Sequence, residues 1–268
     1  MSKIYEALQR AQEEREGVPP LEADERTRRR SWFRSRRPRS TNGHRSHAPT
    51  SLRIDFDLAP DVEEAYQRLG TNLLTPSKDP VVLRDLMVVA SLHGEGTTTT
   101  AALYASTLAK RKKLDVLLIE ANFRTPALEQ VFPIRRNGGF AELIAGTQDL
   151  DTVVQATPQP NLFVITSGHY ETSPSHVLEA PRMSEVLAQL HERFQFIVFD
   201  SAPVNVYTDA QILGARVDAT VFVIEADRTR IEEVQRAKRQ LERSGAKMLG
   251  VLLNRRKSYL PSFLEGMI

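Results

Sequence analysis

The sequence predicts an α/β fold with a mostly parallel central sheet that is covered by helices on both faces. Six short, continuously apolar runs have the length of buried strands, and they alternate with segments whose apolar residues recur at helical spacing. The runs cover residues 86–90, 115–119, 162–166, 196–200, 220–225 and 248–253. Continuously apolar strands are buried on both faces, as in parallel sheets whose crossover helices lie on both sides.

Helical patterns precede the first run and separate the later ones. In residues 61–74, the apolar side chains of Val62, Tyr66, Leu69 and Leu73 share one face of a helix. Further helices are expected over 101–110, from Phe140, over 184–194 and over 230–244.

The composition fits one globular domain with appendages. The chain has 268 residues, 41% of them apolar, and no cysteine, which excludes disulfides and thiolate metal sites and favours a reducing cytoplasm. No run approaches 18 apolar residues, and the N-terminus has no signal-peptide pattern. We therefore expect a soluble cytoplasmic chain whose contact with the inner face of the cell membrane, where it occurs, is peripheral.

Three parts are predicted: an amphipathic helix at 1–16, a disordered linker at 17–60 and a folded domain at 61–268. The linker is rich in proline, serine and arginine and has too little apolar surface to offset the entropy of ordering. Its segment Arg26 to His47 contains nine arginines and no acid, so the rest of the chain has 27 basic against 34 acidic residues. This segment is expected either to contact an anionic membrane surface or to be a solvated linker; nucleic acid is not an expected partner.

Residues 86–100, LMVVASLHGEGTTTT, have the order strand, glycine turn and helix that a phosphate-binding loop requires. Backbone N–H groups of such a turn and of the helix N-terminus donate to phosphate oxygens. The predicted nucleotide-binding residues here are Gly94, Glu95, Gly96, Thr97, Thr98 and Thr99. Thr97 stands where a lysine is usual, and Thr98 stands where a hydroxyl holds Mg²⁺. Taken alone, this stretch is explained equally well by a strand-to-helix turn that needs glycine for its geometry.

Three further polar residues come at the ends of apolar runs. These are Glu120, Asp200 and Asn254. In parallel sheets the ligand sits beyond the carboxyl ends of the strands. We therefore expect the three side chains and the glycine turn to lie at one edge of the sheet and to form one site.

Seven ordered blocks between about Glu63 and Asn254 resemble the cytoplasmic domain of the bacterial tyrosine kinases of exopolysaccharide and capsule synthesis, relatives of the MinD and ParA ATPases. The blocks are EAYQRLGTNL at 64–73, SLHGEGTTTTAA at 91–102, LLIEANFRTPAL at 117–128, GGFAELIAG at 138–146, SPSHVLEAPRM at 173–183, FIVFDSAPVNVYTDA at 196–210 and GVLLNR at 250–255. The resemblance implies a P-loop NTPase fold of the MinD and ParA type that binds ATP or ADP with Mg²⁺.

The resemblance also assigns catalytic roles, and several of the residues that carry them are substituted. The family's loop lysine, which binds the β- and γ-phosphates, matches Thr97. Its DxDxR motif, with aspartates on Mg²⁺ and on the attacking hydroxyl, matches Glu120, Asn122 and Arg124. The Mg²⁺-linked aspartate of the next motif survives as Asp200.

The expected site follows from these matches. The degenerate catalytic residues are Asp200, Glu120 and Asn122, and the expected metal ligands are Thr98 and Asp200. Arg124 and Asn254 join the glycine turn as nucleotide-binding residues, so ATP or ADP with Mg²⁺ is expected to bind weakly.

Two features of assembly and regulation also depart from the family. The helix that closes the family's ring oligomer reads ExxRxxR; here Glu64 remains, but Gln67 and Gly70 replace the arginines. A monomer or dimer is therefore expected rather than a ring. The C-terminal tyrosine cluster of the family is missing, and Tyr259 is the only tyrosine past Asn254.

Three functions remain open from the sequence. The first is a catalytically impaired regulatory or assembly partner of a membrane-embedded polysaccharide co-polymerase or export protein. The second is an active ATP-dependent protein-tyrosine autokinase of the same pathway. The third is a nucleotide-dependent organiser of the ParA and MinD kind, and Leu92 argues against it because it occupies the position of their signature lysine.

Overall fold

The computed structural model describes residues 54, 56, 58, 60–74, 83–135 and 137–256, all of which fall in one compact unit. The predicted helix at 1–16, the arginine segment Arg26 to His47, and Tyr259 lie outside the described residues. In the part that is described, no helix is both long and apolar enough to cross a membrane.

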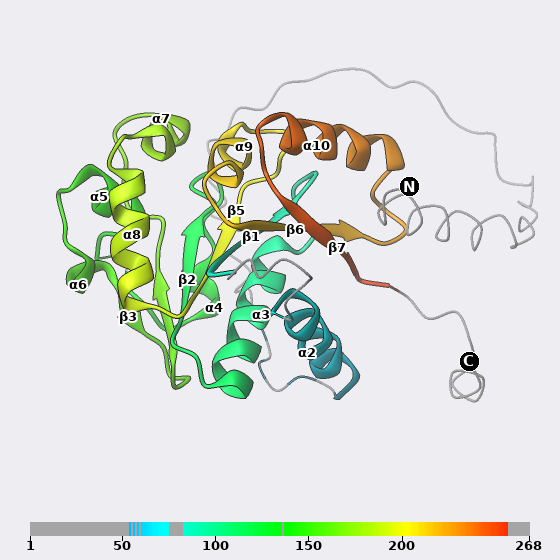
Figure 1. The fold of residues 1–268 in the computed structure, drawn as a ribbon, viewed down its shortest axis with the longest axis horizontal. Helices are drawn as coiled ribbons and strands as arrows, with labels where there is room; N and C mark the ends of the chain where they lie inside the picture. The colour runs from blue at the N-terminus through cyan, green and yellow to red at the C-terminus, as the bar shows by residue number, and fades with distance from the viewer. Residues whose placement is uncertain are drawn as a thin grey trace, which may run out of the picture. The chain divides into compact units, whose positions relative to one another are not determined.

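A single sheet of seven strands, in the order β3-β4-β2-β5-β1-β6-β7, forms the centre of the described fold (Figure 1). The strands are β1 (Asp85–Ala90), β2 (Val116–Ala121), β3 (Gln155–Ala156), β4 (Leu162–Ile165), β5 (Phe196–Ser201), β6 (Ala219–Glu225) and β7 (Met248–Asn254). All neighbouring pairs are parallel except β3 with β4. The six predicted strands are confirmed to within two residues at each end. The two-residue β3 is too short to leave a pattern in the sequence.

Helices cover both faces of this sheet, as predicted. They are α2 (Pro60–Leu74), α3 (Thr97–Lys112), α4 (Leu128–Val131), α5 (Phe140–Ala145), α6 (Leu150–Val153), α7 (Pro174–Glu179), α8 (Met183–Arg193), α9 (Asp209–Gly214) and α10 (Ile231–Arg243). Figure 1 shows α3 and α2 on one side of the sheet and α9 and α10 on the other. The helices that were not predicted, α4, α6, α7 and α9, have four to six residues each, too few to establish a helical period.

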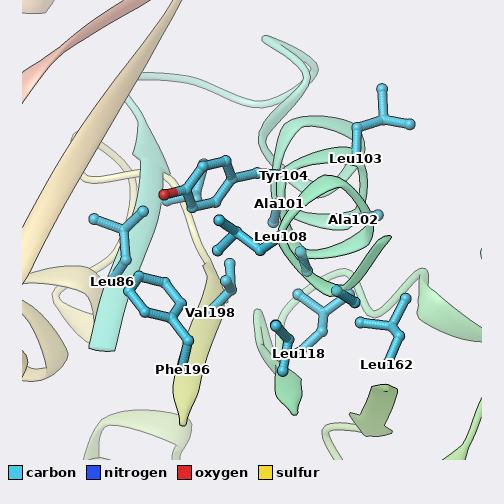
Figure 2. Close-up of a cluster of buried hydrophobic side chains, with 14 of the residues drawn as sticks. Leu86, Ala101, Ala102, Leu103, Tyr104, Leu108, Leu118, Leu162, Phe196 and Val198 are labelled. Atoms are coloured by element: carbon cyan, nitrogen blue, oxygen red, sulfur yellow. The ribbon is translucent and has the colours of Figure 1, made fainter. Parts of the chain in front are cut away.

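The core on the α3 side combines the small side chains of α3 with aliphatic and aromatic side chains of the sheet and helices. Residues 101–109 of α3 are all buried, and the alanines among them let the helix approach the sheet closely. Figure 2 shows Tyr104 and Leu108 of α3 beside Leu86 of β1 and Phe196 of β5. The rings of Tyr104 and Phe196 meet edge to face, with 6.2 Å between centroids. This packing fixes the helix whose N-terminus carries the glycine turn.

The packed part of the chain begins before residue 61, the predicted start of the folded domain. Ile54, Phe56 and Leu58 are partly buried against the core, and the ring centroids of Phe56 and Phe132 lie 5.3 Å apart. The alternation of apolar residues with aspartates at 54–58 is a period-two pattern that the proline- and arginine-rich composition of the preceding segment obscures.

Candidate functional site

The glycine turn, residues 91–96, joins β1 to α3 at the carboxyl edge of the sheet. Gly94 and Gly96 have φ values of +83° and +96°, which side chains with a Cβ rarely adopt. A Cβ on Gly96 would also lie 2.1 Å from Nδ2 of Asn254. That amide donates to the backbone oxygen of Glu95 at 2.9 Å. The end of β7 therefore contacts the glycine turn, as predicted, and explains why residue 96 is glycine.

The side chain of Glu95 stabilises the turn from within. Its carboxylate is buried and accepts hydrogen bonds from the backbone N–H of Leu92 at 2.8 Å and from the Ser91 hydroxyl at 3.2 Å. The Thr229 hydroxyl, from the segment after β6, donates to the same carboxylate. In this arrangement the carboxylate of Glu95 is occupied by the loop and by Thr229, so it stabilises the shape of the turn.

Thr98 and Asp200 are in contact at the carboxyl edge of the sheet. The Thr98 hydroxyl donates to Oδ2 of Asp200 at 2.7 Å, although the two residues come from α3 and β5. Asp200 is fully buried, and its Oδ1 has no hydrogen-bond partner among the described residues. Burial raises the pKa of Asp200 to about 8; the charge of Glu120 adds to this effect, and the Thr98 hydrogen bond opposes it.

An unpartnered buried carboxylate oxygen beside a hydroxyl suits Mg²⁺. Carboxylate and hydroxyl oxygens are hard ligands, and Mg²⁺ usually keeps several waters, so that one or two protein ligands and substrate phosphates hold it. Within the described ranges no group of three acidic or histidine side chains is placed to hold a metal. The unpartnered Oδ1 of Asp200 and the adjacent Thr98 hydroxyl fit a Mg²⁺ that is shared with phosphate, and these two residues would be its protein contacts.

Glu120 is engaged by the backbone around it. It is the register neighbour of Asp200 across β2 and β5. Its Oε1 accepts from the N–H groups of Ala127 and Leu128 at 2.5 and 2.7 Å, and its Oε2 accepts from Ser167 at 3.0 Å. Three converging N–H donors make this carboxylate the anchor of the α4 start and of the segment after β4.

Asn122 and Arg124 also make local contacts. The Asn122 side chain exchanges hydrogen bonds with the backbone N–H and hydroxyl of Thr125, at 3.2 and 3.0 Å. Arg124 donates from two nitrogens to the buried carboxylate of Asp209, at 2.9 and 3.2 Å, and this pairing raises the pKa of Arg124. Its guanidinium lies 4.6 Å from the ring centroid of Tyr207. These contacts hold the edge of the site together.

Two arginines that sequence reasoning missed lie against the glycine turn. Nη1 of Arg255 donates to the backbone oxygen of Gly94 at 3.2 Å, and a Cβ on Gly94 would lie 3.5 Å from Nη1 of Arg228. The rule that placed Asn254 at the site applies equally here, because Arg228 follows β6 and Arg255 follows β7.

Known proteins resemble this chain over most of its length. The chain is 31% identical over 194 residues to the tyrosine-protein kinase YwqD of Bacillus subtilis. The aligned region covers 72% of this chain and 81% of that protein. It is 33% identical over 195 residues to the tyrosine-protein kinase CpsD of Streptococcus pneumoniae, covering 72% and 84%. The chain belongs to the bacterial tyrosine-protein kinase family. No protein-family model matches it.

Solved structures agree with this family and with the predicted fold. The kinase domain of the Escherichia coli tyrosine kinase ETK superposes with a TM-score of 0.70 at 25% identity, covering 78% of this chain and 84% of that one. The cell division ATPase MinD of Pyrococcus furiosus superposes with a TM-score of 0.54 at 21% identity, covering 67% and 76%. The second likeness concerns the fold alone. Both confirm that this tyrosine-kinase relative has the P-loop fold of the MinD type.

Proposed function

We propose that this member of the tyrosine-kinase family is catalytically impaired and acts as a regulatory or assembly partner in exopolysaccharide synthesis and export. The observation that carries the proposal lies at the positions of the family's second motif. There Glu120 is engaged by three backbone N–H groups, and Asn122 is engaged by Thr125. Of the carboxylates at the predicted catalytic positions, only Asp200 keeps an oxygen without a partner among the described residues.

The substitutions act on the steps that phosphoryl transfer needs most. The protein contributes to this reaction chiefly by positioning the phosphate and neutralising its charge. Thr97 supplies no charge where the family has lysine, and losing one pre-organised donor of that kind costs on the order of 3 kcal/mol of transition-state stabilisation. Asn122 has no basic site at neutral pH, so it cannot take the proton of an attacking hydroxyl.

Nucleotide binding is a separate and weaker requirement. The N–H groups at the start of α3 and the Thr98–Asp200 pair support weak binding of ATP or ADP with Mg²⁺, and the first turn of α3 carries no acidic side chain to repel an anion. A bound Mg²⁺ would neutralise part of the phosphate charge. In this proposal the nucleotide serves as a structural or regulatory ligand.

The proposed partner is a membrane-embedded polysaccharide co-polymerase or export protein, contacted from the cytoplasm at the inner face of the cell membrane. This assignment rests on the resemblance to kinases of exopolysaccharide and capsule synthesis and on membership of the bacterial tyrosine-protein kinase family. The proposed state in solution is a monomer or dimer, and no nucleic-acid partner is proposed.

A turnover assay on the purified full chain tests the impaired chemistry. ATP hydrolysis and tyrosine phosphorylation are expected at background with Mg²⁺, and Asp200→Ala is expected to change neither. The repair variant Thr97→Lys with Asn122→Asp is expected to bind ATP more tightly, because the lysine returns a charge to an otherwise intact loop. Mg²⁺-dependent turnover that Asp200→Ala abolishes would instead establish the active autokinase.

A further inference from the structure

Two guanidinium groups are held against the glycine turn. Arg255 donates to the backbone oxygen of Gly94 at 3.2 Å, and Nη1 of Arg228 lies 3.5 Å from the position of a Cβ on Gly94. These side chains come from the carboxyl ends of two neighbouring strands, β6 and β7, and Gly94 follows β1. The parallel topology therefore brings the two positive charges to the loop from positions more than 130 residues away in sequence.

The two arginines share one carboxylate. Glu225 accepts from Arg228 at 2.7 Å and from Arg255 at 3.0 Å. Partial burial pushes the pKa of Glu225 upward, but the hydrogen bonds and charges of Arg255 and Arg228 outweigh it and hold that pKa below its usual range. Glu225 is therefore ionised near neutral pH, and this carboxylate pairs with two guanidinium groups beside the loop.

Both guanidinium groups also keep hydrogen-bonding capacity. Their side chains are 61% and 57% exposed, and each guanidinium has five N–H donors, most of which the contacts above leave unused. Exposed ion pairs of this kind add little to stability, so the fold gains little from holding two arginines at this point.

The site beside the two arginines suits an anionic ligand that binds together with a cation, such as phosphate with Mg²⁺. The buried Oδ1 of Asp200 has no partner among the described residues, and the N-terminus of the 16-residue α3 opens without a side-chain cap. A Mg²⁺–phosphate ligand meets both requirements, yet Thr97 supplies no charge to hold it. Arginine is the side chain best shaped to bind phosphate oxygens, through two parallel N–H donors.

The geometry points to Arg228 and Arg255 as a cation pair that binds the phosphates of a nucleoside di- or triphosphate at the glycine turn and replaces the missing loop lysine in binding. This inference rests on the proposed function, because it takes nucleotide as the ligand of the site. The charges stand beside Gly94, whereas the lysine position is Thr97 at the start of α3. The pair therefore supports affinity for the ligand without restoring phosphoryl transfer.

Calorimetry on the full chain tests the pair with three probes: ATP with Mg²⁺, inorganic tripolyphosphate and adenosine. Arg228→Gln with Arg255→Gln is expected to weaken binding of ATP and of tripolyphosphate by roughly tenfold or more, the loss typical of a charge-assisted hydrogen bond. Adenosine binding is expected to stay unchanged, because adenosine has no phosphate. Arg228→Lys with Arg255→Lys is expected to have an affinity between those of the wild type and the glutamine variant, because lysine keeps the charge but loses the two-donor geometry.

The matched control is Arg239→Gln with Arg243→Gln, which removes the same charge from two exposed arginines in the second half of α10. An equal loss of affinity in the control would mean that the effect comes from the overall charge of the protein, and it would contradict a specific role for Arg228 and Arg255. Unchanged ATP affinity in Arg228→Gln with Arg255→Gln would also overturn the pair while leaving nucleotide as the ligand. If the wild-type chain binds tripolyphosphate but not ATP, nucleotide is not the ligand of the site. If that tripolyphosphate binding still depends on the two arginines, their role as a phosphate-binding pair stands. Binding of no probe would overturn both.

Discussion

Asp200 carries an ionisation cost that its neighbours do not offset. Its carboxylate is fully buried, one oxygen accepts from Thr98, and the other has no partner among the described residues. Its pKa of about 8 lies above the unfolded value near 3.8. Wild-type stability from this residue is therefore full below about pH 3.8 and is lost progressively as pH rises toward 8.

Asp200→Asn should remove this loss, because asparagine does not titrate and its oxygen still accepts from Thr98. Without Mg²⁺, the free energy of unfolding of the variant relative to wild type is expected to rise by about 1.4 kcal/mol per pH unit between pH 4 and 8 and then level off. Urea unfolding at a series of pH values measures it. A difference that does not change with pH would mean that this carboxylate is not held neutral by burial.

Glu120, at a predicted catalytic position, accepts hydrogen bonds from three backbone N–H groups. Glu120→Gln leaves one carbonyl oxygen for three N–H donors and turns an amide donor toward at least one of them. We expect a destabilisation of about 1–3 kcal/mol, the cost of a buried unsatisfied donor, measured by urea unfolding at neutral pH. Glu192→Gln, at an exposed position in α8, is the control. Equal values for both variants would show that the three contacts contribute nothing to stability.

At the scale of elements, the glycine turn and β7 fit together through Gly96 and Asn254. Gly96→Ala introduces both a strained φ of +96° and a Cβ 2.1 Å from the Asn254 amide. Gly245→Ala is a control for the strain alone, since its φ is +86° and no atom lies within 4 Å of its Cβ. Gly96→Ala is therefore expected to lower the thermal unfolding midpoint more than Gly245→Ala does.

The clash can be separated from the strain by a second substitution. Combining Gly96→Ala with Asn254→Ala should destabilise the chain by less than the sum of the two single variants, because residues in contact are not additive. Additive values would indicate that the amide moves aside freely and that glycine is required at residue 96 only for its backbone conformation.

At the scale of the whole molecule, the α2 helix, which is expected to match the family's ring contact, packs on α3 within the chain. A Cβ on Gly70 would lie 3.4 Å from Cδ2 of Leu108 in α3. With its amide turned so that the oxygen faces donors, the side chain of Gln67 accepts from Arg111 of α3 at 3.0 Å. Neither residue offers the charge that the family's arginines carry. Light scattering is expected to give a monomer or dimer, and a stable ring-sized assembly would contradict this.

The arginine segment, which lies outside the described residues, is the part of the chain predicted to contact an anionic membrane surface. Each basic residue near an anionic surface contributes on the order of 1 kcal/mol, so replacing the nine arginines of Arg26 to His47 with glutamine should abolish co-sedimentation with anionic vesicles at low salt. Substitution is preferable to truncation at Asp61, which would remove the packed residues Ile54, Phe56 and Leu58. Equal sedimentation of both chains would make the segment a linker only.

The sequence alone determined six of the seven described strands, five of the described helices and the edge of the sheet at which the candidate site lies. Continuous apolar runs, helical spacing and a glycine turn are local signals in the sequence. A strand that is buried on both faces of a parallel sheet requires apolar residues along its length, so its pattern is clear. The resemblance that rests on these blocks was confirmed by relatives at about 31–33% identity.

Only the tertiary structure decided what the polar residues of that edge contact. Glu120 finds Ser167 47 residues later, Arg124 finds Asp209 85 residues later, and Gly94 meets Arg255 161 residues later. A polar side chain takes its role from the nearest donor or acceptor in space, and strand order, not sequence position, sets which one that is. Sequence patterns record which residues are buried, because burial repeats along a strand or helix. A single contact between distant strands leaves no such repeat.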